Sequence, residues 1–356
     1  MNYKRLISVI SLILALSMIF CSCKTDNGKV DNTGDDVKYY DQQAAFSANY
    51  SLDCSEMTYL FYGTINDFYS AYANYMSYIG LDLEKSLKTQ QCSFEEDVNQ
   101  TWFDYFLVST KLYAEQFIVL SEVASSEGIS LTDEEKAEID EGINQIKDYC
   151  KSNNITIDEY FDNYYGNGVD EESVRHVMDI CFKASSYYNK IYNGYTFTDE
   201  EITNYINENL ADEEDYKYVN VRHILVKTED EAKELLNEIL KEEDVEKAFS
   251  LAAAENTLDG GSKNTGGLYE NIYKGQMVET FENWCFDKSR KVGDTGIVES
   301  THGFHIMYFS SFSDKTYFNE TADLGLRNAK FNKQYDEWCK LYPVTFNDEV
   351  LQKIDA

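Results

Sequence analysis

Apolar positions recur at helical spacing almost throughout residues 44–206. Ile139 and Ile143 fall on one face of a predicted helix, because residues three and four apart lie on the same side of an α-helix. Thr132 stands just before this helix and Glu135 follows three residues later, which is the pattern of a capping box. The same helix-start pattern recurs at Thr198–Glu201 and Thr228–Glu231.

Two short runs of β-branched and aromatic residues interrupt the helical pattern. Val219–Val226 and Gly303–Phe309 each predict a strand, and they contain His223 and His305 respectively. Between them lie two helical patterns, a glycine-rich turn and the segment Gly275–Phe281. This order of elements predicts a compact α+β domain of ordinary single-domain size.

Helical spacing resumes after Phe309, and the apolar face of this last segment has too few partners in its own stretch of chain. Such a helix must bury its face against another element, and the N-terminal helices offer the surface. We therefore predict the fold class α+β, with a domain at residues 216–313 inserted in a mostly α-helical domain formed by residues 42–215 and 314–356.

The N-terminus has the composition of an export signal. Lys4 and Arg5 precede a short apolar run that ends at Phe20, which is typical of a secretory signal rather than a membrane span. The following Cys21 and Cys23 resemble the acceptor position of the lipobox of bacterial lipoproteins. This resemblance implies a signal peptide at residues 1–22, and ordinary secretion with a removed peptide stays open.

Cys23 is the better lipid acceptor, because Ser22 is the small residue that such cleavage needs, although Cys21 stays open as the site. Two acyl chains, palmitate among them, would hold the mature chain stably at the extracytoplasmic side of the cell membrane. Residues 23–41 are polar and predict a flexible tether.

The charge balance excludes one class of partner. A formal net charge of −33 leaves no general attraction to nucleic acid, whose phosphates require Lys and Arg. Solvated acidic faces explain most charge runs, and a preference for basic clients is the alternative.

The cysteines after Cys23 are widely spaced and include no Cys-x-x-Cys pair. The sequence therefore predicts no metal site, and export permits disulfides without fixing their pairing. Most of these cysteines are expected to act as small buried hydrophobic residues. They are Cys54, Cys92, Cys150, Cys181, Cys285 and Cys339.

Tyrosine is unusually frequent, with 29 residues. Most aromatic side chains at helical spacing are expected to form helix–helix core. The alternative is an aromatic surface that meets many unfolded chains, since Tyr offers a broad amphipathic contact.

The inserted domain resembles the parvulin-type peptidyl-prolyl isomerases. The resemblance rests on five motifs in one order: Arg222-His223-Ile224-Leu225-Val226, Gly266-Gly267-Leu268, Gly275-Gln276-Met277, Phe281 and Gly303-Phe304-His305-Ile306. The helical halves with the lipobox resemble, more weakly, the PrsA/SurA group of exported foldases.

The resemblance implies isomerisation of X–Pro bonds, a reaction that needs neither a nucleophile nor a cofactor. Met277 and Phe281, four residues apart, are expected to close over a proline ring, with Leu268 as a further wall. His223 and His305 would form the floor, hydrogen-bonded to each other or through a hydroxyl group. By the same resemblance, Asp259 stands where many parvulins carry a cysteine or an aspartate.

Two further expectations concern the clients. Glu229, Asp230 and Glu231 follow the first strand with only Lys227 nearby, so we expect no preference for phosphorylated substrates. The implied partners are unfolded exported polypeptides that contain proline, and the oligomeric state, a dimer included, stays open.

Two functions follow from the resemblance. The first is a membrane-anchored foldase that combines prolyl isomerisation with holding-chaperone activity. The alternative is a non-catalytic chaperone lipoprotein whose parvulin domain only binds unfolded chains.

Overall fold

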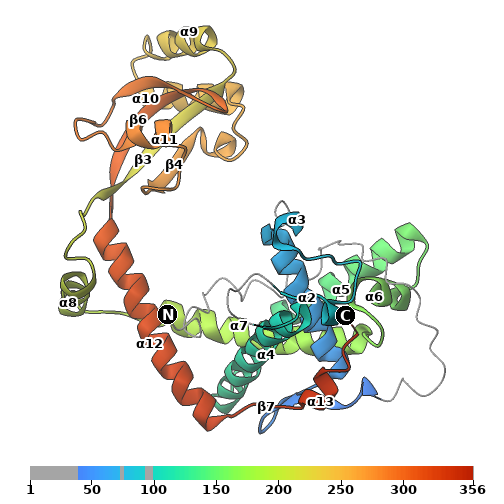
Figure 1. The fold of residues 1–356 in the computed structure, drawn as a ribbon. Coiled ribbons are helices and arrows are strands. Elements are labelled where there is room, and N and C mark those ends of the chain that lie inside the picture. The colour runs from blue at the N-terminus through green and yellow to red at the C-terminus, as the bar shows by residue number, and fades with distance from the viewer. Residues whose placement is uncertain (1–38, 73–75, 93–98, 356) are drawn as a thin grey trace. The chain divides into compact units, whose positions relative to one another are not determined.

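The computed structural model describes residues 39–72, 76–92 and 99–355, which form two separate units. The described residues from 39 to 195 and from 331 to 355 form the first, here called the helical unit. Thr196–Lys330 form the second, here called the inserted unit. Figure 1 shows the elements of both. The predicted signal peptide and Cys23 lie outside the described residues.

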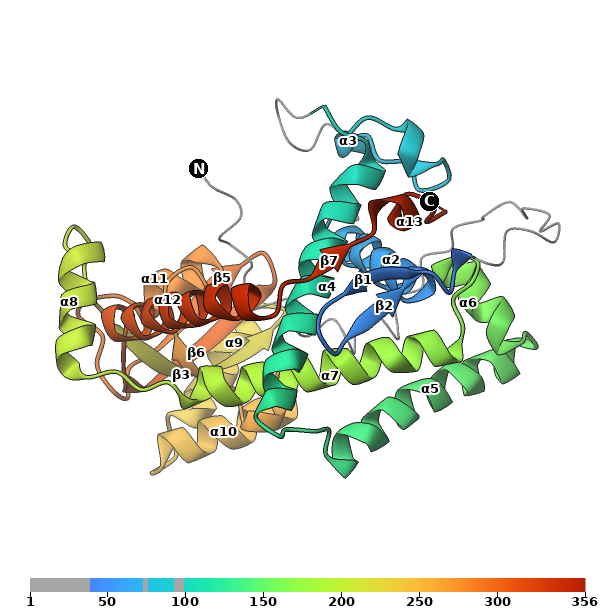
Figure 2. The ribbon, with the colours of Figure 1, turned by 90° about the horizontal axis from the view of Figure 1, so that it is seen from below.

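The described residues of the helical unit include four long helices. Figure 2 shows α5 running beside α7, with α4 crossing α7. Its helices are α2 (Cys54–Tyr72), α3 (Met76–Ile79), α4 (Trp102–Ser126), α5 (Asp133–Asn153), α6 (Ile157–Tyr165), α7 (Glu171–Gly194) and the short C-terminal α13 (Asp348–Leu351), with a 3-10 turn at Leu87–Thr89.

The helix starts follow the sequence signals. Thr132 and Glu135 make a reciprocal capping box at α5, as predicted, and Thr198 and Glu201 do the same at the next helix. At the third predicted start, Thr228 accepts the hydrogen bond of the Glu231 backbone N–H without the reciprocal bond. Each cap satisfies a backbone N–H that has no partner within its helix.

The core of the helical unit is aromatic. The prediction of helix–helix core is confirmed for a set of buried tyrosines: Tyr59, Tyr62, Tyr160, Tyr165, Tyr187, Tyr188, Tyr192 and Tyr195. Over both units, five of the six described cysteines are buried, and one of them, Cys285, belongs to the inserted unit. Burial raises the pKa of Cys285 to about 12 and that of Cys54 to about 11, as expected of cysteines that act as apolar residues.

A small antiparallel sheet corrects the prediction that helix begins near residue 44. The sheet has the order β2–β1–β7, with β1 at Gln43–Phe46, β2 at Ser51–Asp53 and β7 at Thr345–Phe346. These strands are too short to show a period of two. The turn of the hairpin is held by the buried carboxylate of Glu122, which accepts hydrogen bonds from the Asn49 backbone N–H and side-chain amide.

The inserted unit is built on a four-stranded antiparallel sheet of order β4–β3–β6–β5. The two central strands are the predicted ones, and both are longer than predicted. The strands are β3 (Lys217–Val226), β4 (Leu268–Ile272), β5 (Thr295–Ser300) and β6 (Gly303–Thr316). The helices are α8 (Asp199–Asn209), α9 (Glu229–Ile239), α10 (Val245–Asn256), α11 (Glu279–Cys285) and α12 (Tyr317–Leu341), with a 3-10 turn at Lys263–Thr265.

The two faces of this sheet carry separate cores. Ile224, Ile306 and Tyr308 pack on one face with α9 and α10, around Phe249. Val221, Met307 and Phe309 point to the other face and pack with Phe281 of α11. Because side chains alternate along a strand, Val221–Val226 of β3 and Phe304–Phe309 of β6 divide between the two faces, and the register shifts only before Val221.

The boundaries of the inserted unit lie outside the predicted limits of 216 and 313. α8 and the first half of α12 belong to it, because Arg327 lies over the Phe197 ring at 5.9 Å and a Cβ atom on Gly325 would meet the Tyr205 hydroxyl. Tyr216 also stacks on Tyr317, with ring centroids 5.2 Å apart. α12 therefore continues from the inserted unit into the helical unit.

The described residues contain no helix that combines the length and the apolar character needed to span a bilayer.

Candidate active site

The register of β3 and β6 brings the two predicted histidines together. The Cα of His223 pairs with that of Met307, and Leu225 pairs with His305, so the two histidines are diagonal neighbours on one face. Their Nδ1 atoms lie 3.2 Å apart, and their rings are nearly stacked with centroids at 5.4 Å. Both side chains are buried, 3% and 6% exposed, so water does not compete for this hydrogen bond.

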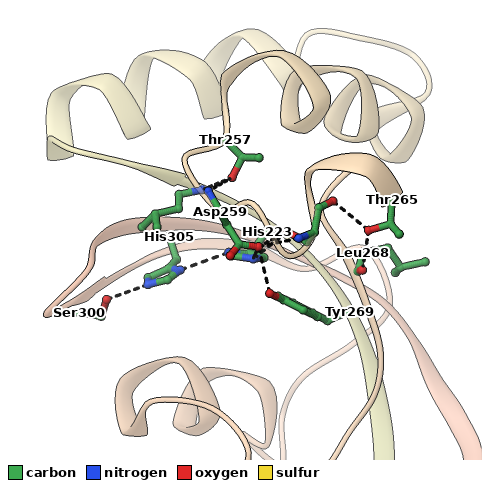
Figure 3. A network of polar contacts seen from close by, with 10 residues as sticks. His223, Thr257, Asp259, Thr265, Leu268, Tyr269, Ser300 and His305 are labelled. Carbon is green, nitrogen blue, oxygen red and sulfur yellow. Dashed lines mark hydrogen bonds and ion pairs between the residues drawn. The ribbon is translucent and has the colours of Figure 1, made fainter. Parts of the chain in front are cut away.

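Asp259 is placed by the end of α10. The Thr257 hydroxyl accepts hydrogen bonds from the backbone N–H groups of Leu225 and Asp259, at 3.0 and 3.1 Å. These bonds tie the loop after α10 to strand β3. As a result, Asp259 Oδ2 lies 3.2 Å from His223 Nε2. Figure 3 shows the two side chains in contact.

Two hydroxyl groups hold the Asp259 carboxylate. Tyr269 donates to Oδ2 at 3.0 Å, and the Ser262 hydroxyl and backbone N–H donate to the same oxygen. Partial burial acts to raise the Asp259 pKa, but these hydrogen bonds and the neighbouring His223 outweigh it and lower the pKa to about 2. Asp259 is therefore an ionised acceptor at neutral pH.

Ser300 completes the chain of contacts at the other end. Its hydroxyl lies 2.7 Å from His305 Nε2, and it also accepts the His302 backbone N–H at 3.1 Å. The pairing of Ser300 with Gly303 across the β5–β6 turn brings this hydroxyl next to His305. Figure 3 shows Ser300, His305, His223 and Asp259 in one row.

Both imidazole rings are neutral at pH 7. Burial lowers the His305 pKa to about 4, with the nearby His223 and His302 adding to the effect. Burial also lowers the His223 pKa, against the opposing influence of Asp259. The charged form of each ring is disfavoured because the surroundings cannot hydrate it.

The hydrogen bonds fix a single direction along the row. Ionised Asp259 only accepts, and the Ser262 hydroxyl, 3.1 Å from His223 Nε2, donates its own proton to Asp259. His223 therefore donates through Nε2 to these two oxygens and accepts at Nδ1. His305 must then donate through Nδ1 and accept the Ser300 hydroxyl at Nε2. Every ring nitrogen has a partner in this arrangement, and the network can orient a polar group without giving up a proton.

Phe281 covers the histidine pair edge-on. Its ring meets those of His223 and His305 at centroid distances of 5.3 and 5.4 Å, with interplanar angles near a right angle. Met277 packs against the same core and is partly buried. The predicted cluster of Met277, Phe281 and the two histidines is therefore brought together on one face of the sheet.

Leu268 is not part of this face, contrary to the predicted wall. Its Cα pairs with Arg222, whose guanidinium contacts Glu246 of α10 on the opposite face. The next residue, Tyr269, stacks on His223 with centroids 5.2 Å apart. Because side chains alternate along β4, Tyr269 faces His223 where Leu268 was expected.

Gly267 allows β4 to approach β3 at the site. Its φ is +77°, and a Cβ atom there would lie 2.4 Å from the His223 carbonyl oxygen. The Gly267 carbonyl in turn accepts the His223 backbone N–H at 2.8 Å. Only glycine meets both the conformation and the close approach.

Sequence reasoning did not identify Thr257, Ser262, Tyr269 and Ser300. Ser262 could have been predicted from the sequence, because Asp259-Gly260-Gly261-Ser262 is typical of a turn. In such a turn, the serine hydroxyl can donate a hydrogen bond to the aspartate carboxylate. A signal also existed for Ser300, since a two-residue turn before Gly303 sets it beside His305. Nothing in the sequence alone indicated that Tyr269 faces His223. In the described part of the chain, no group of His, Cys, Asp and Glu side chains is arranged to hold a metal ion.

Residues 205–311 match the family model described as the PPIC-type PPIASE domain. The chain is 30% identical over 206 residues to Foldase protein PrsA of Caldanaerobacter subterraneus, covering 54% of this chain and 63% of that protein. It is 35% identical over 107 residues to Foldase protein PrsA 1 of Listeria monocytogenes, covering 30% of this chain and 35% of that protein. The matched segments span less than two thirds of the length of either relative.

Two solved structures are also similar in part. The crystal structure of PrsA from Bacillus subtilis aligns with 76% of this chain and 94% of its own, at 20% identity and a TM-score of 0.33. The solution structure of the parvulin of Nitrosopumilus maritimus aligns with 27% of this chain and 98% of its own, at 28% identity and a TM-score of 0.24.

Proposed function

We propose, from the parvulin-type peptidyl-prolyl isomerase domain that this chain carries at residues 205–311, that the protein isomerises X–Pro bonds in unfolded exported polypeptides. The observation that carries the proposal is the neutral, fully paired row from Ser300 to Asp259, covered by the ring of Phe281. The domain match alone would not indicate a working site.

The reaction needs a surface that favours a twisted amide. Resonance sets a rotation barrier of about 18–20 kcal/mol for the peptide bond, and catalysis lowers it by binding the twisted form better than either planar form. The apolar side chains of Phe281 and Met277 are suited to the proline ring. The buried imidazole pair offers fixed dipoles with little water to reorganise.

Apolar side chains next to the site give a client chain further contacts. Leu258 follows Thr257 and precedes Asp259, and it is 55% exposed. Val278 follows Met277 and is 38% exposed. Exposed apolar groups beside a polar site are typical of surfaces that bind other chains.

A proline-limited refolding assay tests the isomerase proposal. Full-length protein in detergent should accelerate the slow phase of a client whose native state contains a cis-proline. His305→Gln keeps a polar side chain of similar length but changes the row, and it should slow catalysis at least tenfold. If full-length protein leaves the slow phase at its uncatalysed rate, the isomerase proposal fails.

Holding-chaperone activity is the second part of the proposal. It is supported by exposed apolar side chains on the helical unit, among them Tyr72, Val108 and Leu341 at 37%, 55% and 66% exposure. His305→Gln should suppress aggregation of an unfolded client as well as the wild type does. Loss of both activities in this variant would contradict separate chaperone and isomerase functions.

We further propose that the protein acts outside the cytoplasm, held at the membrane by a lipid on Cys23. Basic Lys4 and Arg5, the apolar run after them and the small Ser22 support this placement. Labelling with radioactive palmitate in a bacterial host should mark the wild type and Cys21→Ser, and should not mark Cys23→Ser. Equal labelling of the two variants would overturn the assignment of Cys23.

A further inference from the structure

Tyr269 makes two different contacts at the site. Its ring lies nearly parallel to that of His223, at an interplanar angle of 20° and a centroid distance of 5.2 Å. Its hydroxyl donates to Asp259 Oδ2 at 3.0 Å. The one side chain therefore touches both members of the His223–Asp259 pair.

The loop after α10 has a place for the phenol oxygen. A Cβ atom on Gly261 would lie 2.7 Å from the Tyr269 hydroxyl, closer than real Cβ contacts come. The adjacent Gly260 has open space at the corresponding position. Neither glycine has a positive φ, so the absence of a side chain at Gly261 matters for space and not for backbone conformation.

We infer that Tyr269 is a positioning residue that holds the Asp259 carboxylate against His223 and thereby sets the direction of the whole hydrogen-bonded row. This inference deepens the proposed isomerase function and rests on it for its catalytic consequence. Asp259 fixes the N–H of His223 on Nε2, which leaves Nδ1 to accept from His305. A carboxylate that turns away would release both rings from this arrangement.

The phenol does what an aliphatic side chain cannot do. Without its hydroxyl, Asp259 would keep only the donors of Ser262 and His223, and its pKa would rise from its low value. Without its ring, one flat face of His223 would lose its stacking partner. The first effect changes the electrostatics of the row, and the second changes the freedom of the imidazole.

Two variants separate the hydroxyl from the ring. Tyr269→Phe removes the donor and keeps the stacked ring. Gly261→Ala displaces the hydroxyl without altering any side chain of the row, and Gly260→Ala is its matched control. In the Tyr269→Phe background, Gly261→Ala should have little further effect, because the oxygen that it would meet is gone.

The measurements are kcat and KM for a proline-containing peptide and the ¹⁵N chemical shifts of the His223 ring in full-length protein. For Tyr269→Phe and Gly261→Ala we expect kcat to fall about three- to tenfold, as for loss of one hydrogen bond, with KM within about twofold of the wild type. The Nε2–H form of His223 should lose population in both variants and stay unchanged in Gly260→Ala.

The outcomes distinguish this inference from the proposed function. If the wild type catalyses nothing, the isomerase proposal fails, and the ¹⁵N shifts alone decide whether Tyr269 sets the tautomer. If the shifts and kcat of Tyr269→Phe match the wild type, Tyr269 is only a packing residue. Equal effects of Gly261→Ala and Gly260→Ala would also overturn the inference.

Discussion

The Nδ1 atoms of His223 and His305 lie 3.2 Å apart, so one ring must donate the hydrogen bond and the other must accept it. Two protonated rings would point two N–H groups at each other. The pair therefore works only while at least one ring is neutral. Burial makes both rings neutral at pH 7, since it lowers both pKa values.

The histidine pair predicts a loss of stability in acid. Folding lowers the His305 pKa from 6.5 to about 4, so the unfolded chain binds more protons between these pH values. The stability that this group contributes is complete above pH 6.5 and falls as the pH drops towards 4, by at most about 3 kcal/mol. Proton NMR titration of the His305 ring should give a midpoint near the folded pKa, and a midpoint at 6.5 or above would contradict the buried neutral pair.

Ser300→Ala should weaken catalysis and stability together. The change leaves His305 Nε2 as a buried acceptor without the hydroxyl that reaches it at 2.7 Å. We expect a loss of about 1–2 kcal/mol in the free energy of unfolding and a several-fold fall in kcat. Thr301→Ala, in the exposed turn beside it, is the control for the loss of a hydroxyl. Equal effects of the two substitutions would show that the contact with His305 contributes neither to the free energy of unfolding nor to kcat.

Phe281 and Phe249 form a matched pair on opposite faces of one sheet. Both are buried, but only Phe281 contacts the histidine rings. Phe281→Leu and Phe249→Leu should each lower the free energy of unfolding by about 1–2 kcal/mol, because both swaps disturb a tight core. We expect a rise in KM for Phe281→Leu alone, measured with a proline-containing peptide. A similar rise for Phe249→Leu would attribute the effect to general loosening of the domain.

The helical unit should show the opposite pH dependence through His176. The Nδ1 of His176 contacts the buried Glu56 carboxylate, and this hydrogen bond raises the His176 pKa, with Asp179 and Asp53 adding to it. The stabilising effect is full below pH 6.5 and is lost as the pH rises through the folded pKa.

His176→Gln should remove this pH dependence. Since His176 is nearly half exposed, we expect the contribution to be about 1 kcal/mol rather than that of a buried pair. Urea unfolding of wild type and variant at pH 6 and pH 8 measures it. If the difference between the two proteins is the same at both pH values, His176 does not act through its charge.

The sequence predicted the inserted domain well because its signals are local and repeated. Each central strand has its own run of β-branched and aromatic residues, and each histidine lies within such a run. The capping boxes were visible for the same reason, since Thr132 and Glu135 are only three residues apart. The α+β fold class and the relation to parvulin-type domains are confirmed.

The rest depended on pairing between distant residues. Whether Leu268 or Tyr269 faces His223 is decided by the register of β4 against β3, and a shift of one residue exchanges the faces. The hairpin of β1 and β2 could not be predicted, because strands of three or four residues are too short to show an alternation of apolar and polar positions. The outer boundaries were missed because contacts such as Tyr216 on Tyr317 join residues far apart in the chain.

Strand β7 has a consequence for the order of assembly during synthesis. Thr345 and Phe346 pair with Phe46 and Ala45, so the first sheet cannot close until every residue of Thr196–Lys330 has already emerged. The inserted unit is continuous in the chain, so it can fold without any residue that follows Lys330. We expect a released chain that ends at Lys330 to protect Thr196–Lys330 from protease while its N-terminal hairpin is still cleaved. The inserted unit, which is proposed to act on other proteins, would then fold before the helical unit of its own chain.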